Sequence, residues 1–209
     1  MKELLLATNN KGKVGEMRSM LAGVDVTVMG LDDLPSYTEV PETGETFREN
    51  ARLKAAGYAQ QSGRVALADD SGLEVLALAG RPGVYSARYG GDQLGFNEKM
   101  QLILTELEET GNADRSAQFV CSVAIAEPSG EIIFEADGFC SGQIARQPRG
   151  LGGFGYDPIF EPDGFELTFG ELNSAIKHEI SHRAAAFRQI IPFLRDFNAL
   201  RLDQPSLDA

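Results

Sequence analysis

The sequence lacks several features that particular classes of protein require. No segment approaches the roughly 18 unbroken apolar residues of a membrane span. The apolar run at residues 4–7 is too short for a signal peptide. The two cysteines, Cys121 and Cys140, form no Cys-x-x-Cys pair and lie in strand-like segments, which favours buried, reduced thiols without a chemical role. We therefore expect a cytoplasmic protein that has no membrane partner.

Basic side chains are also scarce. With 31 acidic and 19 basic residues the net charge is −12, which argues against binding of duplex nucleic acid through a broad basic face. An anionic ligand would need a local cluster of Lys, Arg, helix N-termini or metal. The 209 residues, 43% of them hydrophobic, suffice for a core in one domain or in two lobes that share a sheet. We expect residues 200–209 to form a polar, frayed tail.

Two adjacent carboxylates, Asp69 and Asp70, follow the β-prone run at residues 65–68 and precede Ser71 and Gly72. This pattern predicts a strand that delivers charge at its C-terminal end, where open α/β sheets place their ligand sites. Two anions held there need a cation. If the cation is Mg²⁺, which often bridges a carboxylate to phosphates, the expected ligand is phosphorylated. An ordinary surface turn stays an alternative, because turns also use Asp, Ser and Gly.

The polar turn at residues 8–13 is a candidate phosphate site. It lies between an apolar strand, residues 4–7, and a helix predicted over residues 12–22. Backbone N–H groups at the helix start and the charge of Lys13 can hold a phosphate. The turn is not a Walker loop, because the first glycine is missing and Val14 stands where a Mg²⁺-binding Ser or Thr belongs. Plain helix capping is the alternative.

A strong helix is predicted from Phe47 to about Gln61, and Gly63 ends it. Asn50 and Lys54 are four residues apart and therefore share a face of this helix. If that face looks toward the two aspartates, Lys54 can reach a phosphate beside the metal. Otherwise Lys54 is an ordinary solvated lysine.

The remaining elements give a mixed α/β class with an antiparallel component. Residues 96–107 carry an apolar stripe that predicts a helix in the core or at a subunit contact. Strands are predicted over residues 24–28, 118–126, 131–136 and 138–145, of which the last three form a meander.

Aromatic side chains alternate with glycines in residues 150–160, so a flat ring can approach the backbone while Phe154 or Tyr156 stacks on it. Asp157 beside such a stack can accept a hydrogen bond from a base edge. A glycine-rich hairpin with core aromatics is the alternative.

Ser181 is a good N-cap for a helix whose first turn contains His182 and Arg183. Cations are disfavoured at that end of a helix dipole, so we expect an anionic or carbonyl-bearing ligand to compensate them. Further along, Pro192 predicts a kink or a restart.

Six blocks occur in this order along the chain: residues 8–16, 47–55, 68–73, 82–89, 152–158 and 181–183. Together they closely resemble the inosine triphosphate pyrophosphatase family. That family hydrolyses non-standard purine nucleoside triphosphates such as ITP, dITP and XTP to the monophosphate and pyrophosphate. The likeness spans nearly the whole chain and implies an elongated α/β fold. In it a mixed central sheet is flanked by helices, and an active-site cleft lies between two lobes. The lobes form one domain over residues 1–199, assembled as a homodimer.

The resemblance also assigns roles. Asp70 matches a general base and metal-linked carboxylate, with Mg²⁺ as cofactor, and Glu42 is the second candidate metal ligand. Water would attack the α-phosphorus while Asp70 takes the proton. The substrate-binding residues implied are Thr8, Asn9, Asn10, Lys11, Gly12, Lys13, Lys54, Ser71, Phe154, Gly155, Tyr156, Asp157, Lys177, His182 and Arg183.

The residues expected around the base also predict which purine the site prefers. A six-keto purine offers an acceptor to Arg or His, whereas the amino group of adenine leaves buried donors unpaired.

The chain departs from the family where two adjacent glutamates are usual, because Pro41 replaces one and Glu42 remains, with Glu39 nearby. A pyrophosphatase for modified pyrimidine or methylated nucleotides is an alternative, and so is a nucleotide-binding regulatory module without turnover.

Overall fold

The computed structural model describes residues 3–202, and these form one six-stranded sheet with the order β2-β1-β3-β4-β5-β6. β1 pairs in parallel with β2 and β3, whereas the β3–β4, β4–β5 and β5–β6 pairs are antiparallel. The predicted mixed α/β class is therefore confirmed. The strands are β1 (Glu3–Leu6), β2 (Thr27–Gly30), β3 (Val65–Val75), β4 (Ser116–Ala126), β5 (Ile132–Ile144) and β6 (Phe160–Pro162).

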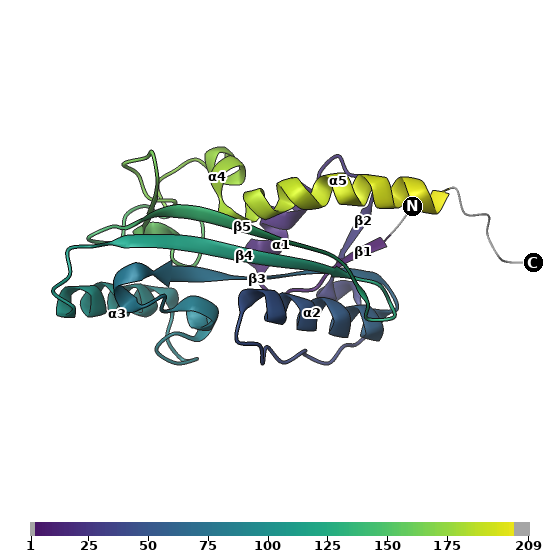
Figure 1. Ribbon diagram of the computed structural model, residues 1–209, viewed down its shortest axis with the longest axis horizontal. Coiled ribbons are helices and arrows are strands. Elements are labelled where there is room, and N and C mark those ends of the chain that lie inside the picture. The colour runs from purple at the N-terminus through teal and green to yellow at the C-terminus, as the bar shows by residue number, and fades with distance from the viewer. Residues whose placement is uncertain (1–2, 203–209) are drawn as a thin grey trace, which may run out of the picture.

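Helices cover both faces of the long strands. In Figure 1, α5 runs along one side of β3, β4 and β5, and α2 runs along the other. None of the helices in residues 3–202 combines the length and the apolar character that a membrane span requires. The α-helices are α1 (Lys11–Met20), α2 (Phe47–Ser62), α3 (Phe96–Glu109), α4 (Ser174–Ile180) and α5 (His182–Leu202).

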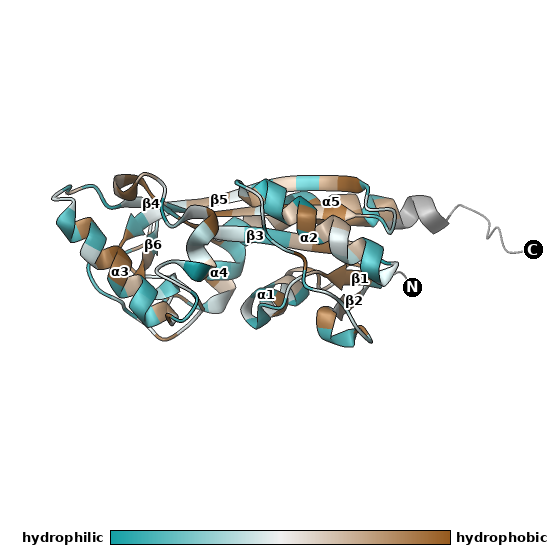
Figure 2. Ribbon diagram, turned by 90° about the horizontal axis from the view of Figure 1, so that it is seen from below, coloured by the Kyte–Doolittle hydropathy of each residue, from teal (hydrophilic) through white to brown (hydrophobic). Residues whose placement is uncertain are grey.

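Strand alternation divides the apolar side chains of the sheet between two cores. Leu4 and Leu6 belong to the core shared with α1 and α5, whereas Leu5 and Ala7 belong to the core shared with α2. Because both of its faces are covered, β1 is a nearly continuous apolar run, and Figure 2 shows it in brown, whereas the helices carry both brown and teal stretches.

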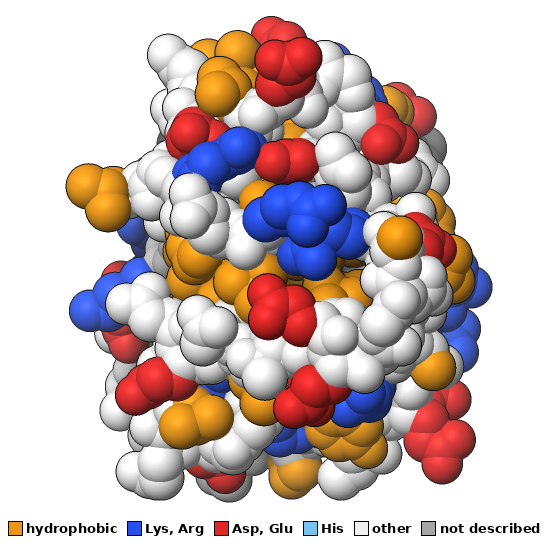
Figure 3. All heavy atoms as spheres, turned by 90° about the vertical axis from the view of Figure 1, so that its left-hand side faces the viewer, with side chains coloured by type: hydrophobic (Ala, Val, Ile, Leu, Met, Phe, Trp, Pro, Cys, Tyr) orange, Lys and Arg blue, Asp and Glu red, His pale blue; other side chains and the backbone are white. Residues whose placement is uncertain are grey.

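A third core lies at the far end of the long strands, where α3 packs on the last part of β3. It contains Leu73, Ile103, Phe119 and Phe160. Figure 3 views the molecule from this end, where Lys and Arg side chains gather in a compact central group with acidic side chains around it. The long strands therefore connect two packed ends of the molecule.

The strand predicted over residues 65–68 does not end before Asp69 and Asp70, so the alternative of a surface turn at these residues is wrong. β3 continues through both residues to Val75, because residues from Ala66 to Val75 pair with β4. The parallel pairing with β1, however, ends at Leu67, so the carboxylates lie just beyond the carboxyl end of the parallel part of the sheet. The expected location of the charge holds, although the local conformation is a strand.

Other boundaries also differ from the predictions. The strand predicted over residues 24–28 is β2, which lies later, and the two strands predicted from residue 131 to residue 145 are the single strand β5, paired with β4 along its length. α5 does not restart at Pro192, because Ile190 and Leu194 on either side of it stay buried against the sheet. Residues 200–202 of the predicted tail belong to α5, and residues 203–209 lie outside the described residues.

Candidate active site

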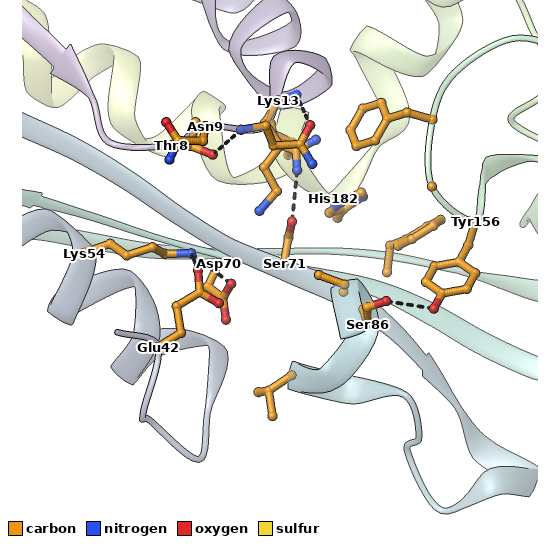
Figure 4. A pocket seen from close by; sticks show the side chains of 18 of the residues that line it. Thr8, Asn9, Lys13, Glu42, Lys54, Asp70, Ser71, Ser86, Tyr156 and His182 are labelled. Atoms are coloured by element: carbon orange, nitrogen blue, oxygen red, sulfur yellow. Dashed lines mark hydrogen bonds and ion pairs between the residues drawn. The ribbon is translucent and has the colours of Figure 1, made fainter. Parts of the chain in front are cut away.

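One cavity collects most of the side chains that the sequence singled out. At one end lie Lys54, Asp70 and Glu42, and at the other lie Tyr156 and His182 (Figure 4). Two predicted residues, Lys11 and Gly12, do not line this cavity; they lie at the start of α1, beside neighbouring hollows. The predicted residues that line it are Thr8, Asn9, Asn10, Lys13, Glu42, Lys54, Asp70, Ser71, Phe154, Gly155, Tyr156, Asp157, Lys177, His182 and Arg183.

The pleat of β3 sends the two adjacent carboxylates to opposite faces of the sheet. Asp70 lies on the α2 side, where it meets Lys54, and Asp69 lies on the side of α1 and α5, where it meets Lys13 and Arg183. One strand therefore supplies an anion to each of two separate groups of cations.

Lys54 joins two carboxylates at the first end of the cavity. Its Nζ lies 2.7 Å from Glu42 Oε1 and 3.0 Å from Asp70 Oδ1. Burial alone would lower the pKa of Lys54, but the carboxylates of Asp70, Asp69 and Glu42 outweigh it and raise the pKa. For Asp70, burial raises the pKa, and the ammonium groups of Lys54 and Lys13 only partly oppose this. A carboxyl group whose affinity for protons is increased in this way is suited to accept one.

The turn before α1 is a helix cap that also presents charge to the cavity. Asn10 is the N-cap, and its Oδ1 accepts a hydrogen bond from the Lys13 backbone N at 3.2 Å. Lys13 Nζ lies 3.1 Å from Asp69 Oδ2. Burial would raise the pKa of Asp69, but Lys13, Arg183 and Lys54 hold it below its ordinary value. The capping interpretation therefore applies to Asn10, while Lys13 carries its charge to the centre of the site.

The protein itself supplies the anions for Arg183, where the sequence predicted a ligand. The Arg183 guanidinium is fully buried and bonds to Asp69, at 3.1 Å, to Ser71, at 3.0 Å, and to Glu16. Although burial would lower it, these carboxylates raise the pKa of Arg183. Ser181 caps α5 as predicted, since its Oγ accepts from the Ala184 N at 3.2 Å. The expected compensation of the helix dipole is thus internal.

The aromatic end is fixed by a buried ion pair. Asp157 Oδ2 accepts hydrogen bonds from Lys177 Nζ at 2.5 Å and from the Phe154 N at 2.7 Å. The Lys177 ammonium also lies 4.5 Å from the centroid of the Phe154 ring. A Cβ on Gly153, where φ is +71°, would be 2.0 Å from Asp157 Oδ2, so only glycine fits this turn. Asp157 therefore positions Phe154 and Lys177 around the cavity.

The His182 ring lines the same region of the cavity. Its ring stacks on Phe119 with centroids 4.7 Å apart and planes inclined by 14°. Nδ1 is buried and has no hydrogen-bond partner among the described residues. Burial and the neighbouring charges of Arg183 and Lys177 lower the pKa of His182 well below its usual value, so the ring is neutral. A neutral imidazole donates from one ring nitrogen and accepts at the other, so the ring can bond to a ligand in the cavity.

Sequence reasoning missed several residues of this site. Glu16 pairs with Lys177 at 2.8 Å and with Arg183, and its position at the end of the first sequence block was its only signal. Asn50 bonds to Asp70, and its only signal in the sequence is the helix face that it shares with Lys54. Phe119 had no local signal, because its neighbour His182 comes from a distant part of the chain.

Comparisons with known proteins agree with this arrangement. The model of the Ham1 family matches residues 4–193. A dITP/XTP pyrophosphatase from Prochlorococcus marinus is 48% identical over 193 residues, which are 92% of this chain and 92% of that protein. A dITP/XTP pyrophosphatase from Nostoc sp. is 49% identical over 191 residues, covering 91% and 93% of the two chains. A HAM1 protein structure from Coxiella burnetii has a TM-score of 0.87 and 40% identity, covering 94% of this chain and 100% of that one. The chain belongs to the Ham1 family.

Proposed function

We propose that this protein hydrolyses non-standard purine nucleoside triphosphates, namely ITP, dITP and XTP, to the nucleoside monophosphate and pyrophosphate. The observation that carries the proposal is the single cavity that joins Lys13, Lys54 and Asp70 at one end to Phe154 and His182 at the other. Relatives at 48 and 49% identity are named dITP/XTP pyrophosphatases. The activity removes such nucleotides from the nucleotide pool.

At the phosphate end, Lys13 and Lys54 neutralise the triphosphate and the departing pyrophosphate. Both ammonium groups are bonded to carboxylates of β3, which hold them beside the cavity. A water molecule adds to the α-phosphorus, the bond from that phosphorus to the bridging oxygen of the β-phosphate breaks, and Asp70 accepts the proton of the water.

Two carboxylates, Asp70 and Glu42, would hold a Mg²⁺ ion at this end. Both bond to the same ammonium group, that of Lys54, so both face one place. No group of three or more His, Cys, Asp or Glu side chains in residues 3–202 could hold a metal ion. The pair of carboxylates of Asp70 and Glu42 fits Mg²⁺, which commonly takes one or two protein carboxylates and completes its ligands with phosphate oxygens and water. When bound, the ion supplies charge that activates the water and stabilises the leaving group.

At the other end, Phe154 and Tyr156 offer rings for stacking, and the neutral His182 offers a hydrogen bond to the base. A six-keto purine can accept that hydrogen bond, whereas adenine presents a donor and leaves the buried donor unpaired. Arg183 Nε, Nη1 and Nη2 all have partners in Asp69, Glu16 and Ser71, so Arg183 mainly shapes this end. The homodimer and the cytoplasmic location stay predictions.

The proposal is tested by pyrophosphate release from ITP, XTP, GTP, ATP and dTTP with Mg²⁺, against the same assays in EDTA. We expect turnover of ITP and XTP, and loss of at least about 100-fold in kcat for Asp70→Asn, because a general base contributes roughly 10²–10⁴-fold. The matched control is Asp196→Asn, an exposed aspartate on α5, which should behave as the wild type.

Two results would replace this proposal. Turnover restricted to modified pyrimidine or methylated nucleotides would make the protein a different nucleotide pyrophosphatase. Binding of ITP without cleavage of any nucleotide by the wild type would make it a nucleotide-binding module.

A further inference from the structure

Asn50 is an uncharged side chain of α2 that lies beside Asp70 and is fully buried. Its Nδ2 donates a hydrogen bond to Asp70 Oδ2 at 3.2 Å, and its Oδ1 accepts one from the Gly44 backbone N at 2.8 Å. The Gly44 N–H determines how the amide faces, since a reversed amide would bring two donors together. Asn50 therefore presents its NH₂ group to Asp70.

α2 bonds to both oxygens of the Asp70 carboxylate. Lys54, one helical turn after Asn50, approaches Oδ1 at 3.0 Å, while Asn50 holds Oδ2. In the proposed reaction Lys54 turns its charge toward a phosphate. Asn50 carries no charge to offer a phosphate, and its other end is engaged by Gly44, so its bond to Asp70 persists. Asp70 then keeps one fixed oxygen and one oxygen free to face the water.

The Asn50 amide also fixes residues 38–44, the segment that carries Glu42. Gly44, two residues after Glu42, packs so closely on the start of α2 that a Cβ there would lie 2.6 Å from Glu49 Cβ and 2.8 Å from Asn50 Oδ1. Near its other end the segment is held by Gln61, which bonds to the N and O atoms of Thr38 at 2.7 and 3.0 Å. Asn50 therefore holds this segment close to Glu42, whereas Gln61 holds it at Thr38.

We propose that Asn50 is a positioning residue of the reaction, which orients the Asp70 carboxylate and anchors the Glu42 segment to α2. The inference rests on the proposed function and adds to it a residue that acts through Asp70, without touching the substrate. It predicts a defect in the chemical step that is separate from nucleotide binding, because Lys13, Phe154 and His182 are untouched.

The test compares Asn50→Ala, which removes both hydrogen bonds, with Asn50→Asp, which keeps an oxygen for Gly44 but has no N–H for Asp70. For each we would measure kcat and KM for ITP with Mg²⁺, and ITP binding in EDTA by calorimetry. We expect kcat to fall about 10- to 100-fold in both variants, as is typical when the partner of a metal-linked carboxylate is removed. KM, and affinity in EDTA, should stay within about threefold of the wild type.

Gln61→Ala is the matched control, because it releases the same segment at Thr38 without touching Asp70. It should keep kcat near the wild-type value. The proposal is overturned if Asn50→Ala keeps wild-type kcat, if Asn50→Asp is fully active, or if Gln61→Ala loses as much as Asn50→Ala. Should thermal unfolding show that Asn50→Ala does not fold, Asn50→Ser takes its place. If the wild type itself cleaves no ITP, the proposed function fails; if the wild type is active and the variants match it, only this inference fails.

Discussion

At the scale of single residues, the imidazole of His182 is a sensitive probe of the site, because it is buried without a carboxylate partner. Its pKa in the folded protein lies well below the usual value, through burial and the charges of Arg183 and Lys177. Below a pH of about 6.5 the unfolded chain therefore binds a proton that the folded chain does not. This part of the stability is complete above that pH and is lost as the pH falls.

We predict that His182→Phe, which keeps a flat ring against Phe119, reduces the loss of stability between about pH 6.5 and pH 5. The difference in the free energy of unfolding between the two proteins should change by up to about 1.4 kcal/mol per pH unit, the limit for one proton. Urea unfolding at several pH values measures it. Carboxyl groups titrate in both proteins and cancel in the comparison, so parallel pH curves would show that His182 is not held neutral.

Arg183 shows what single-residue reasoning could and could not reach. The sequence predicted that a cation in the first turn of α5 must be compensated, and the dipole argument for this was sound. The compensating anions, Asp69 and Glu16, lie more than 100 positions away in the chain. Nothing local to Arg183 could identify them. The need of a residue for a nearby opposite charge can therefore be predicted from sequence, whereas the residue that provides this charge is known only from the fold.

At the scale of elements, α5 begins directly on β5. A Cβ on Gly138 would lie 2.1 Å from the His182 O and 2.4 Å from the Ala186 N, so the helix backbone occupies the space of a side chain. We predict that Gly138→Ala pushes the first turn of α5 away from the sheet. It should destabilise the protein by about 1–3 kcal/mol, as overpacking does, and lower kcat/KM for ITP because His182 and Arg183 move with the turn.

The chain offers a matched glycine for that experiment. Gly15 is exposed on α1, and a Cβ there would meet nothing within 4 Å. Gly15→Ala should raise the free energy of unfolding by about 0.5–1 kcal/mol, since alanine favours a helix. Thermal or urea unfolding of both variants measures the contrast. Equal stability of Gly138→Ala and the wild type would mean that α5 can shift without loss.

β3 and β5 show why some elements could be predicted and others not. The apolar patterns predict most helices and locate β1, β3, β4 and β5 to within a few residues, whereas β2 lies later than expected and β6 is not predicted. Local sequence makes Asp69, Asp70 and Gly138 turn or boundary residues. Each is accommodated inside a strand by a tertiary contact. Asp69 contacts Lys13 and Arg183. Asp70 contacts Lys54 and Asn50, and Gly138 lies against the backbone of α5. Such tertiary contacts outweigh the local conformational preferences of these residues, and the sequence alone does not identify them.

At the scale of the whole molecule, the cavity draws on nearly the full length of the chain. Thr8 and Lys13 come from the start of the chain, Lys54 and Asp70 from α2 and β3, and His182 from the start of α5. A ligand that fills the cavity bonds to elements that otherwise meet mainly through the sheet. Binding should therefore stabilise the protein as one unit, and not only one of its ends.

We predict that ITP in EDTA raises the unfolding temperature more than ATP at the same concentration. A ligand at 100 times its dissociation constant stabilises the folded state by about 2.7 kcal/mol, and each tenfold loss of affinity removes about 1.4 kcal/mol of this. ATP should lose at least that much if His182, which lines the cavity, donates to the six-position of the base, because a six-amino group cannot accept that hydrogen bond. EDTA prevents turnover, so differential scanning fluorimetry reports binding alone. Equal shifts for ATP and ITP would place discrimination in the chemical step, and Asn50 and Asp70 would then carry part of the specificity that we assign to the base end of the cavity.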